Sequence, residues 1–186
     1  MNSLIQALQI IVRFFEAQQI PYMLIGGLAN SIYGIPRQTF DIDIKIILDE
    51  KKNKTFFSAL AKVAAIIPED PSLFLHQTGV IPVEVAGVRV DLVPAVLPYE
   101  LEAFKRIRKE TIFGIEVTVS SAEDLIIQKA ISPRNKDWLD IEGIIENMGK
   151  NLDWTYILFH IKQLSGFLAD SVIYNKIEKL RDAAKL

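Results

Sequence analysis

Apolar residues near the start of the chain recur at helical spacing. Leu4, Leu8, Ile11 and Phe15 stand three or four positions apart, so their side chains share one face of a helix. Gln6, Gln9 and Arg13 place polar residues at helical spacing on another face, and Pro21 interrupts the pattern. The spacing predicts an amphipathic helix that packs on a core.

Five later segments have the pattern of β-strands. Residues 22–25 form a short apolar run, and residues 41–46 alternate polar and apolar side chains, several of them β-branched. The other three segments are 80–86, 88–93 and 112–119, the last of which is either a further strand or a hairpin. The first two of these flank Gly87 and are typical of an antiparallel hairpin. We therefore expect a sheet of about five strands.

The remaining segments are helical or irregular by pattern. Residues 51–67 have helical periodicity, and residues 68–79, with two prolines and a glycine, are predicted to form a loop. Ser121 followed three positions later by Asp124 is a capping signature at the start of a helix. Helices are then expected up to residue 130, over 135–147 and 153–167, and from 170 to the end.

This order of elements predicts an α+β fold of two layers. Residues 1–120 would form a core with a mixed, twisted sheet flanked by helices. Residues 121–186 would form a C-terminal helical bundle that packs on the sheet. No repeat, low-complexity segment or flexible linker separates the two parts.

Composition excludes several classes of protein. The 186 residues carry a net charge of −2 and include no cysteine, so thiol nucleophiles, disulfide scaffolds and zinc–thiolate sites are excluded. The two histidines, His76 and His160, lie far apart and have no partner motif. No apolar run reaches the ~20 residues of a membrane-spanning helix, and the N-terminus lacks a secretory pattern, so we expect a cytoplasmic protein without membrane partners. Catalysis, if present, must depend on carboxylates.

Three aspartates stand in strand-like segments. Asp41 and Asp43 are two positions apart on the 41–46 strand, which directs both side chains to one face. Asp91 interrupts the otherwise apolar segment 88–93, where an acid needs a partner or a cation. Adjacent carboxylates suit a hard divalent ion, and Mg²⁺ is the natural candidate. Alternating acid and apolar residues are also typical of a solvated edge strand, so the first pair alone does not decide the question.

A glycine pair precedes the aspartates. Gly26-Gly27 directly follows the 22–25 strand and precedes a short helical segment. Glycine allows backbone amides to approach phosphate oxygens, and a helix N-terminus favours an anion. The glycine pair and the acids together suit a nucleotide triphosphate and its metal ions.

The spacing of these motifs resembles the signature of the polymerase-β-like nucleotidyltransferases. Gly26-Gly27, thirteen intervening residues, Asp41-Ile42-Asp43 and a later lone Asp91 match that signature. The string from Arg37 through Thr39 to the acids is most similar to the stand-alone bacterial branch that includes the AbiEii-type toxins of abortive-infection systems. The resemblance implies a nucleotidyltransferase fold in which the three aspartates hold two Mg²⁺ ions, or Mn²⁺, and Asp91 helps to activate an acceptor hydroxyl.

A second, helical motif is similar to the same branch. It comprises residues 121–130, with Lys129, followed by residues 134–141, with Asp137 and Asp140. The resemblance implies that Lys129 contacts nucleotide phosphates and that the two aspartates order the site.

One position departs from the family pattern. Many members have serine after the glycines, where this chain has Leu28, and Ser31 one turn later is a possible substitute. Arg37 either clamps phosphate or pairs with a surface aspartate, and Thr39 is a further candidate nucleotide-binding residue.

The implied activity is transfer of a nucleoside monophosphate from an NTP, such as ATP, to a hydroxyl acceptor, with release of pyrophosphate. As in the toxin relatives, the acceptor would be RNA, for example tRNA, or a protein, and an antitoxin partner would accompany the chain. The basic cluster 105–109 is either an RNA contact or a solvated face. Alternatives are a small-molecule acceptor such as an antibiotic, and a catalytically silent nucleotide-binding or interaction module.

Overall fold

The computed structural model describes residues 2–168 and 171–184 and divides the chain into two compact units. The first unit comprises the chain up to Leu28 together with Gln38–Val119. The second comprises Ala29–Arg37 together with the chain from Ser120 onward. The short stretch before the aspartates thus belongs with the C-terminal helices, a grouping that no pattern in the sequence indicated.

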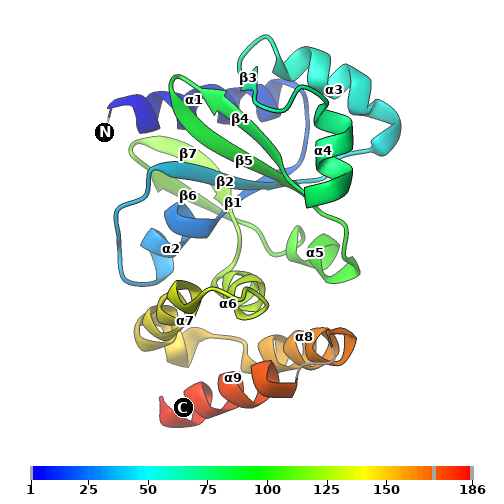
Figure 1. The fold of residues 1–186 in the computed structure, drawn as a ribbon. Helices are drawn as coiled ribbons and strands as arrows, with labels where there is room; N and C mark the ends of the chain where they lie inside the picture. Colours follow the sequence, from blue (N-terminus) through cyan, green and yellow to red (C-terminus); the bar gives the residue numbers. More distant parts are fainter. Residues whose placement is uncertain (1, 169–170, 185–186) are drawn as a thin grey trace. The chain divides into compact units, whose positions relative to one another are not determined.

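The first unit is built on a mixed sheet (Figure 1). Its strand order is β3-β4-β5-β2-β1-β7-β6. The strands are β1 (Tyr22–Ile25), β2 (Asp41–Ile46), β3 (Ala65–Ile66), β4 (Ile81–Val85), β5 (Val88–Pro94), β6 (Arg108–Ile112) and β7 (Ile115–Val119). Strand β2 lies parallel to β5 and antiparallel to β1, which places it at the centre of the sheet.

The sheet has seven strands in the described part of the chain, so the expected number of five is wrong. Of the two alternatives for 112–119, the structure has the hairpin, in which β6 begins earlier than predicted, at Arg108, and a turn at Phe113-Gly114 leads into β7. The first four residues of β6 were not predicted because its sequence, RKETI, is mostly polar and buries only its last residue. Strand β3 has only two residues, too few for a periodic signal.

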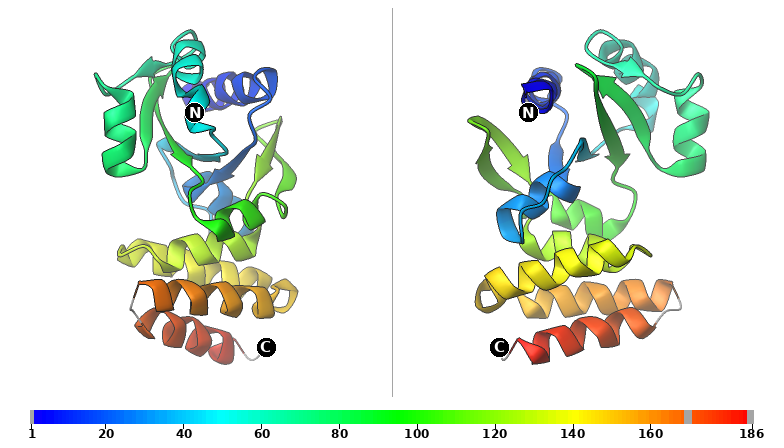
Figure 2. Two further views of the ribbon diagram at one scale, coloured as in Figure 1. Left: turned by 90° about the vertical axis from the view of Figure 1, so that its right-hand side faces the viewer. Right: turned by 60° about the vertical axis from the view of Figure 1, so that its left-hand side comes forward.

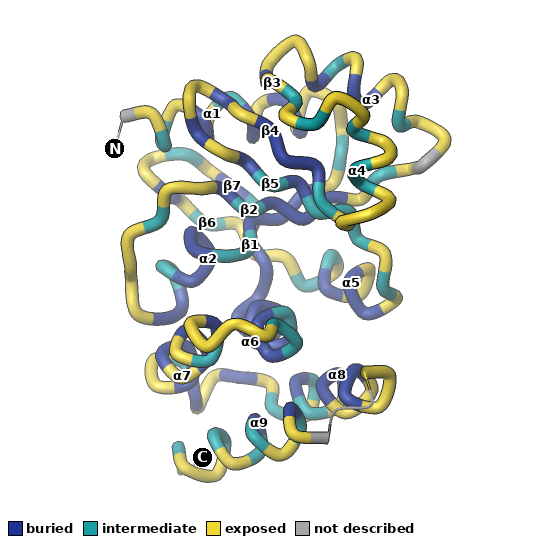
Figure 3. Tube along the Cα trace, in the orientation of Figure 1, coloured by how far each residue is buried: buried dark blue, intermediate teal, exposed yellow. Residues whose placement is uncertain are grey.

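One face of the sheet is covered by helices α1 (Asn2–Ala17) and α3 (Asn53–Leu60). Most of the predicted apolar stripe of α1 is fully buried, and Phe14 contacts Phe56 of α3 edge to face. Every second residue of β2, beginning with Ile42, is buried as well. Figure 2 shows both helices on the same side of the sheet, and Figure 3 shows buried positions concentrated in the central strands. The opposite face of the sheet therefore carries the aspartates.

Two predictions between residues 51 and 79 are wrong. The helix expected over 51–67 is a 3₁₀ turn (Glu50–Lys52) followed by the shorter α3, and the expected loop contains helix α4 (Pro71–Thr78). Asp70 caps α4 by accepting a hydrogen bond from the backbone N–H of Leu73, and Gly79 ends the helix in a left-handed conformation. The proline and glycine that suggested a loop are thus the start and stop signals of a short helix.

The second unit is helical. Its elements are α6 (Ala122–Ala130), α7 (Asn135–Met148), a 3₁₀ turn (Gly149–Asn151), α8 (Trp154–Phe167) and α9 (Ser171–Ala183), together with the end of α2 (Gly26–Tyr33). Ser121 caps α6 as predicted, through a hydrogen bond from the backbone N–H of Asp124. Helices α8 and α9 lie side by side in both views of Figure 2.

The predicted last helix began at residue 170 and ran to residue 186. Residues 170, 185 and 186 lie outside the described residues, and α9 covers the rest up to Ala183. None of the helices in the described part of the chain combines the length and the apolar character that crossing a bilayer requires.

Candidate active site

The strand register places the three predicted aspartates on one face of the sheet. Asp43 of β2 is paired with Asp91 of β5, and Asp41 is paired with Arg89. Paired residues of parallel strands direct their side chains to the same face, and their Cα atoms are about 4.8 Å apart. Asp41 lies about 7 Å further along β2 on that face. The two acidic segments, 48 positions apart in the sequence, thus form one row of carboxylates.

The backbone of the glycine pair lies in close contact with the strand that carries Asp41 and Asp43. A Cβ atom at Gly26 would lie 1.9 Å from Oδ2 of Asp43, and Gly26 has a φ of +63°. A Cβ atom at Gly27 would lie 2.7 Å from Oγ1 of Thr39. Both positions therefore exclude any larger side chain, because the start of α2 passes directly over the aspartate strand. The glycines are required for this close approach.

Polar partners orient the carboxylates of Asp41 and Asp91. Oγ1 of Thr39 donates a hydrogen bond of 2.8 Å to Oδ1 of Asp41. Nε of Arg89 lies 2.9 and 3.1 Å from the two carboxylate oxygens of Asp91. Thr39 thus fixes the orientation of Asp41, and Arg89 supplies the positive charge that a half-buried acid needs.

Sequence reasoning missed a buried ion pair on the same face. Nζ of Lys45 contacts Oε1 of Glu100 on helix α5 (Pro98–Ala103), and both side chains are less than one-tenth exposed. Oε2 of Glu100 accepts hydrogen bonds from the backbone N–H groups of Val96 and Leu97. Lys45 follows Asp41 and Asp43 in the same two-residue alternation, and that alternation was the available signal. No pattern in the sequence pointed to Glu100, since its partner Lys45 is 55 positions away.

The residues fit a hard divalent cation by their chemistry. Within the part of the chain that the structure describes, no three His, Asp or Glu side chains converge into a finished coordination cluster. The acidic row nevertheless offers only carboxylate oxygens, the ligands that Mg²⁺ prefers, and the missing Cβ of Gly26 makes the space that the Asp43 carboxylate occupies. The side chain of Arg89 is 56% exposed, so it can leave Asp91 for solvent when another cation binds.

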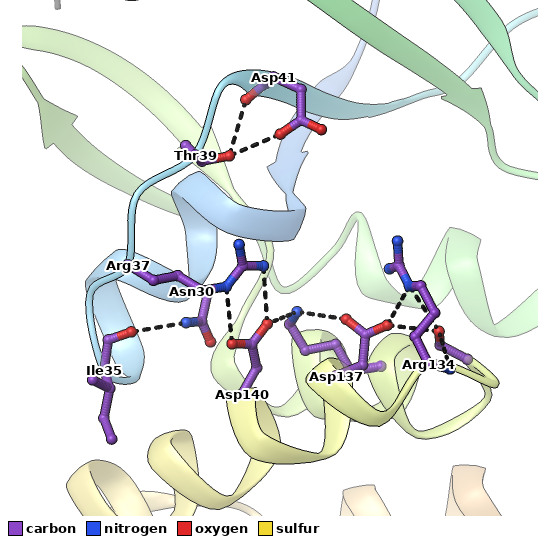
Figure 4. Close-up of polar contacts among 10 residues, drawn as sticks. Asn30, Ile35, Arg37, Thr39, Asp41, Arg134, Asp137 and Asp140 are labelled. Atoms are coloured by element: carbon purple, nitrogen blue, oxygen red, sulfur yellow. Dashed lines mark hydrogen bonds and ion pairs between the residues drawn. The ribbon is translucent and has the colours of Figure 1, made fainter.

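The helical motif forms a polar network within the second unit (Figure 4). Nζ of Lys129 lies 3.1 Å from Oδ1 of Asp137 and 2.6 Å from Oδ2 of Asp140. Arg37 contacts both oxygens of Asp140 at 3.2 Å, and Nε of Arg134 contacts Asp137 at 2.6 Å. Lys129, Asp137 and Asp140 are buried. Each buried charge therefore has an opposite charge beside it, and the network joins α6, α7 and the segment that contains Arg37.

This network lowers the pKa of both aspartates. Burial by itself raises the pKa of Asp137, but hydrogen bonds from Ser132 and Arg134 and the charge of Lys129 outweigh it. Burial likewise raises the pKa of Asp140, and the contacts with Arg37 and Lys129 outweigh it. Both groups are therefore ionised at neutral pH.

The eleven predicted site residues fall into two groups. Those of the first unit, which the structure brings together, are Gly26, Gly27, Thr39, Asp41, Asp43 and Asp91. Those of the second unit are Ser31, Arg37, Lys129, Asp137 and Asp140, of which all but Ser31 form the network. Arg37 contacts Asp140, a pairing that neither alternative from the sequence included. The prediction that Lys129 contacts phosphate stays a prediction.

The basic cluster is partly neutralised by nearby acids. Nζ of Lys105 lies 2.8 Å from Glu102, and Nζ of Lys109 lies 3.4 Å from Glu116. Both lysines are exposed, and the cluster runs from the residues after α5 into β6. Pairing with acids reduces the charge available to a phosphate backbone.

Comparison with known proteins identifies the fold. The chain matches no protein-family model and no curated protein sequence. It is similar to the solution structure of the antibiotic-resistance factor ANT(2'')-Ia, with a TM-score of 0.62, 15% identity, and coverage of 90% of this chain and 95% of the other.

Two further solved structures are similar. An antigenic nucleotidyltransferase-like protein from Paracoccidioides brasiliensis has a TM-score of 0.54 at 15% identity, covering 98% of this chain and 91% of the other. The lincomycin-bound lincosamide antibiotic adenylyltransferase LnuA has a TM-score of 0.51 at 15% identity, covering 74% of this chain and 94% of the other. The chain therefore has the fold of the nucleotidyltransferases.

Proposed function

We propose that the protein is a magnesium-dependent nucleotidyltransferase that moves a nucleoside monophosphate from an NTP to a hydroxyl group and releases pyrophosphate. The observation that carries this proposal is the register of β2 and β5, which aligns Asp43 with Asp91 beside the Gly26-Gly27 turn. Three carboxylates on one sheet face, in this fold, support metal-assisted phosphoryl-type chemistry.

Each residue of the acidic row has a distinct task in this reaction. Asp41 and Asp43 would hold the metal ions, and Thr39 keeps the carboxylate of Asp41 oriented. When bound there, Mg²⁺ would neutralise the charge of the triphosphate and would favour ionisation of the acceptor hydroxyl. A carboxylate oxygen of Asp91 accepts the hydroxyl proton as the acceptor oxygen bonds to the α-phosphorus, and the bond from that phosphorus to pyrophosphate breaks. The backbone at Gly26-Gly27 lies close enough to the acids to contact phosphate oxygens.

The proposal is tested with one variant for each acid. D41N, D43N and D91N should lower pyrophosphate release by about a hundredfold or more, because a bound metal contributes several kcal/mol of charge stabilisation. Calorimetry with Mg²⁺ and each NTP should show weaker binding to D41N and D43N. E116Q, which neutralises an exposed acid on β7, is the matched control and should keep full activity. Unchanged binding and turnover in D41N and D43N would mean that the enzymatic proposal is wrong.

The acceptor within this function is a separate proposal. The resemblance to AbiEii-type toxins favours RNA, tRNA or a protein as acceptor, together with an antitoxin partner. If RNA is the acceptor, its binding should weaken steeply with salt and should depend on the cluster 105–109. A silent nucleotide-binding module would bind Mg²⁺ and NTP without releasing pyrophosphate, so the same assay separates that alternative.

A further inference from the structure

A pocket of about 1020 Å³ lies within the first unit, at the ends of strands β2 and β5. Its walls come from α4, from the residues after β2 and β5, and from Glu100 on α5. Figure 1 shows α4 and α5 on either side of the end of β5. Pockets of small-molecule sites have volumes of roughly 300–1,000 Å³, so this one is large enough for a drug-sized molecule.

The pocket lies near the acidic row on β5, although none of the three aspartates lines it. Val93 lines it and stands two positions after Asp91 on β5, so both side chains lie on one face, about 7 Å apart along the strand. Val93 is paired with Lys45, just as Asp91 is paired with Asp43. Lys45 in turn holds Glu100 at the pocket wall. An occupant that extended about 7 Å past Val93 along β5 would therefore reach Asp91.

The lining indicates the chemistry of the occupant. It is mostly apolar, with Leu75, Val93 and Pro94 among its residues, and its polar groups include His76 and Thr78. Among the described residues that form it, none is lysine or arginine. Of those same residues Glu100 is the one acid, and Lys45 balances its charge. Such a lining does not attract a polyphosphate chain, whereas a neutral or weakly cationic molecule is well suited.

We propose that this pocket binds the acceptor, and that the acceptor is a small, largely apolar molecule whose hydroxyl group reaches Asp91. This inference rests on the proposed nucleotidyl transfer and adds the class of substrate. The hydroxyl loses its proton to Asp91 and forms a bond to the α-phosphorus of the NTP, and pyrophosphate leaves. An RNA or protein acceptor is the competing outcome.

The absence of cysteine from the chain permits a selective test. Ser72 lines the pocket from α4, and Gln77 is exposed on the same helix outside the lining. The variants S72C and Q77C are each alkylated with fluorescein-5-maleimide. The fluorescein group should block the pocket in S72C and leave it open in Q77C. Both are incubated with Mg²⁺, α-³²P-labelled NTPs and a cell extract separated into methanol-soluble small molecules, RNA and protein. Calorimetry with Mg²⁺ and NTP checks that each labelled variant is folded and retains its nucleotide site.

The expected result is label in the small-molecule fraction. Alkylation of S72C should lower that label about tenfold or more, as expected when an acceptor cannot reach its position, and alkylation of Q77C should leave it unchanged. Label in RNA or protein, or transfer to small molecules that the plug does not reduce, overturns the pocket inference and leaves the proposed function standing. If no fraction is labelled, both the pocket inference and the proposed function are wrong. If Mg²⁺-dependent NTP binding is lost as well, the assignment of the nucleotide site is the part that fails.

Discussion

At the scale of single residues, the site depends on the contact between Gly26 and Asp43. The backbone of Gly26 has a φ that other residues rarely adopt, and its missing side chain leaves space that Asp43 fills. Gly87, in the β4–β5 turn, has a similar φ of +77°, but a Cβ atom at that position would meet no described atom within 4 Å. Alanine at position 87 would therefore introduce backbone strain alone, whereas alanine at position 26 would introduce both backbone strain and a steric clash.

We expect G26A to abolish nucleotidyl transfer and to destabilise the protein by more than G87A does. A non-glycine residue in the left-handed region costs about 1–3 kcal/mol, and only G26A adds a clash with a site carboxylate. Urea unfolding and pyrophosphate release measure the two effects. Equal activity in the two variants would contradict the proposed role of the contact.

A second prediction at this scale concerns the hydroxyl of Thr39. Because this hydroxyl orients the carboxylate of Asp41, T39V should lower kcat by roughly 10–100-fold, the equivalent of one hydrogen bond to a charged group. T39S keeps the hydroxyl and should restore most of the activity. Steady-state kinetics on both variants provide the measurement, and a T39S enzyme as slow as T39V would point to packing against Gly27 instead.

At the scale of elements, the network around Lys129 joins α6 to α7. Removing its positive charge leaves Asp137 and Asp140 buried without their shared partner. K129M should therefore reduce the free energy of unfolding by about 3–5 kcal/mol. K136M, at an exposed position of α7, is the control and should change it little. Denaturant unfolding tests this, and a stable K129M that binds NTP weakly would favour direct phosphate contact.

The same network makes stability depend on pH. The pKa values of Asp137 and Asp140 are lowered in the folded protein, so their stabilisation is complete above the ordinary value of 3.8 and is lost as the pH falls through the lower folded values. The free energy of unfolding should thus decrease as acid is added below about pH 4. D140N should be less stable at neutral pH and should show a shallower acid dependence. Urea titrations between neutral and acidic pH compare the two proteins, and parallel curves would contradict the assignment.

At the scale of the whole molecule, net charge and pairing of the basic cluster argue against tight RNA binding. The chain carries −2, and Lys105 and Lys109 each have an acidic neighbour. We expect tRNA to bind weakly at physiological salt, and the double variant K105E/K109E to change that binding little. Gel-shift titrations at two salt concentrations measure it. Tight, salt-sensitive binding that the double variant abolishes would favour an RNA acceptor.

The sequence by itself determined those features that short-range patterns encode. Period-two alternation placed Asp41 and Asp43 on one strand face, and the capping signature at Ser121 marked the start of α6. The central strands and most C-terminal helices were predictable for the same reason, because burial of one face imposes a regular spacing. Short or polar elements carry no such spacing, so β3 was missed and the start of β6 was not predicted.

Only the tertiary structure decided which distant residues meet. The pairing of Asp43 with Asp91, of Lys45 with Glu100 and of Arg37 with Asp140 joins positions that are 48, 55 and 103 apart, and no local pattern specifies such partners. Strand register and helix docking are set by the packing of the whole core, so they fix these contacts together. The pocket lined by Val93 has the same origin, because its walls come from separate segments of the chain. The candidate acids could be read from the sequence, whereas the space in which an acceptor would meet them required the fold.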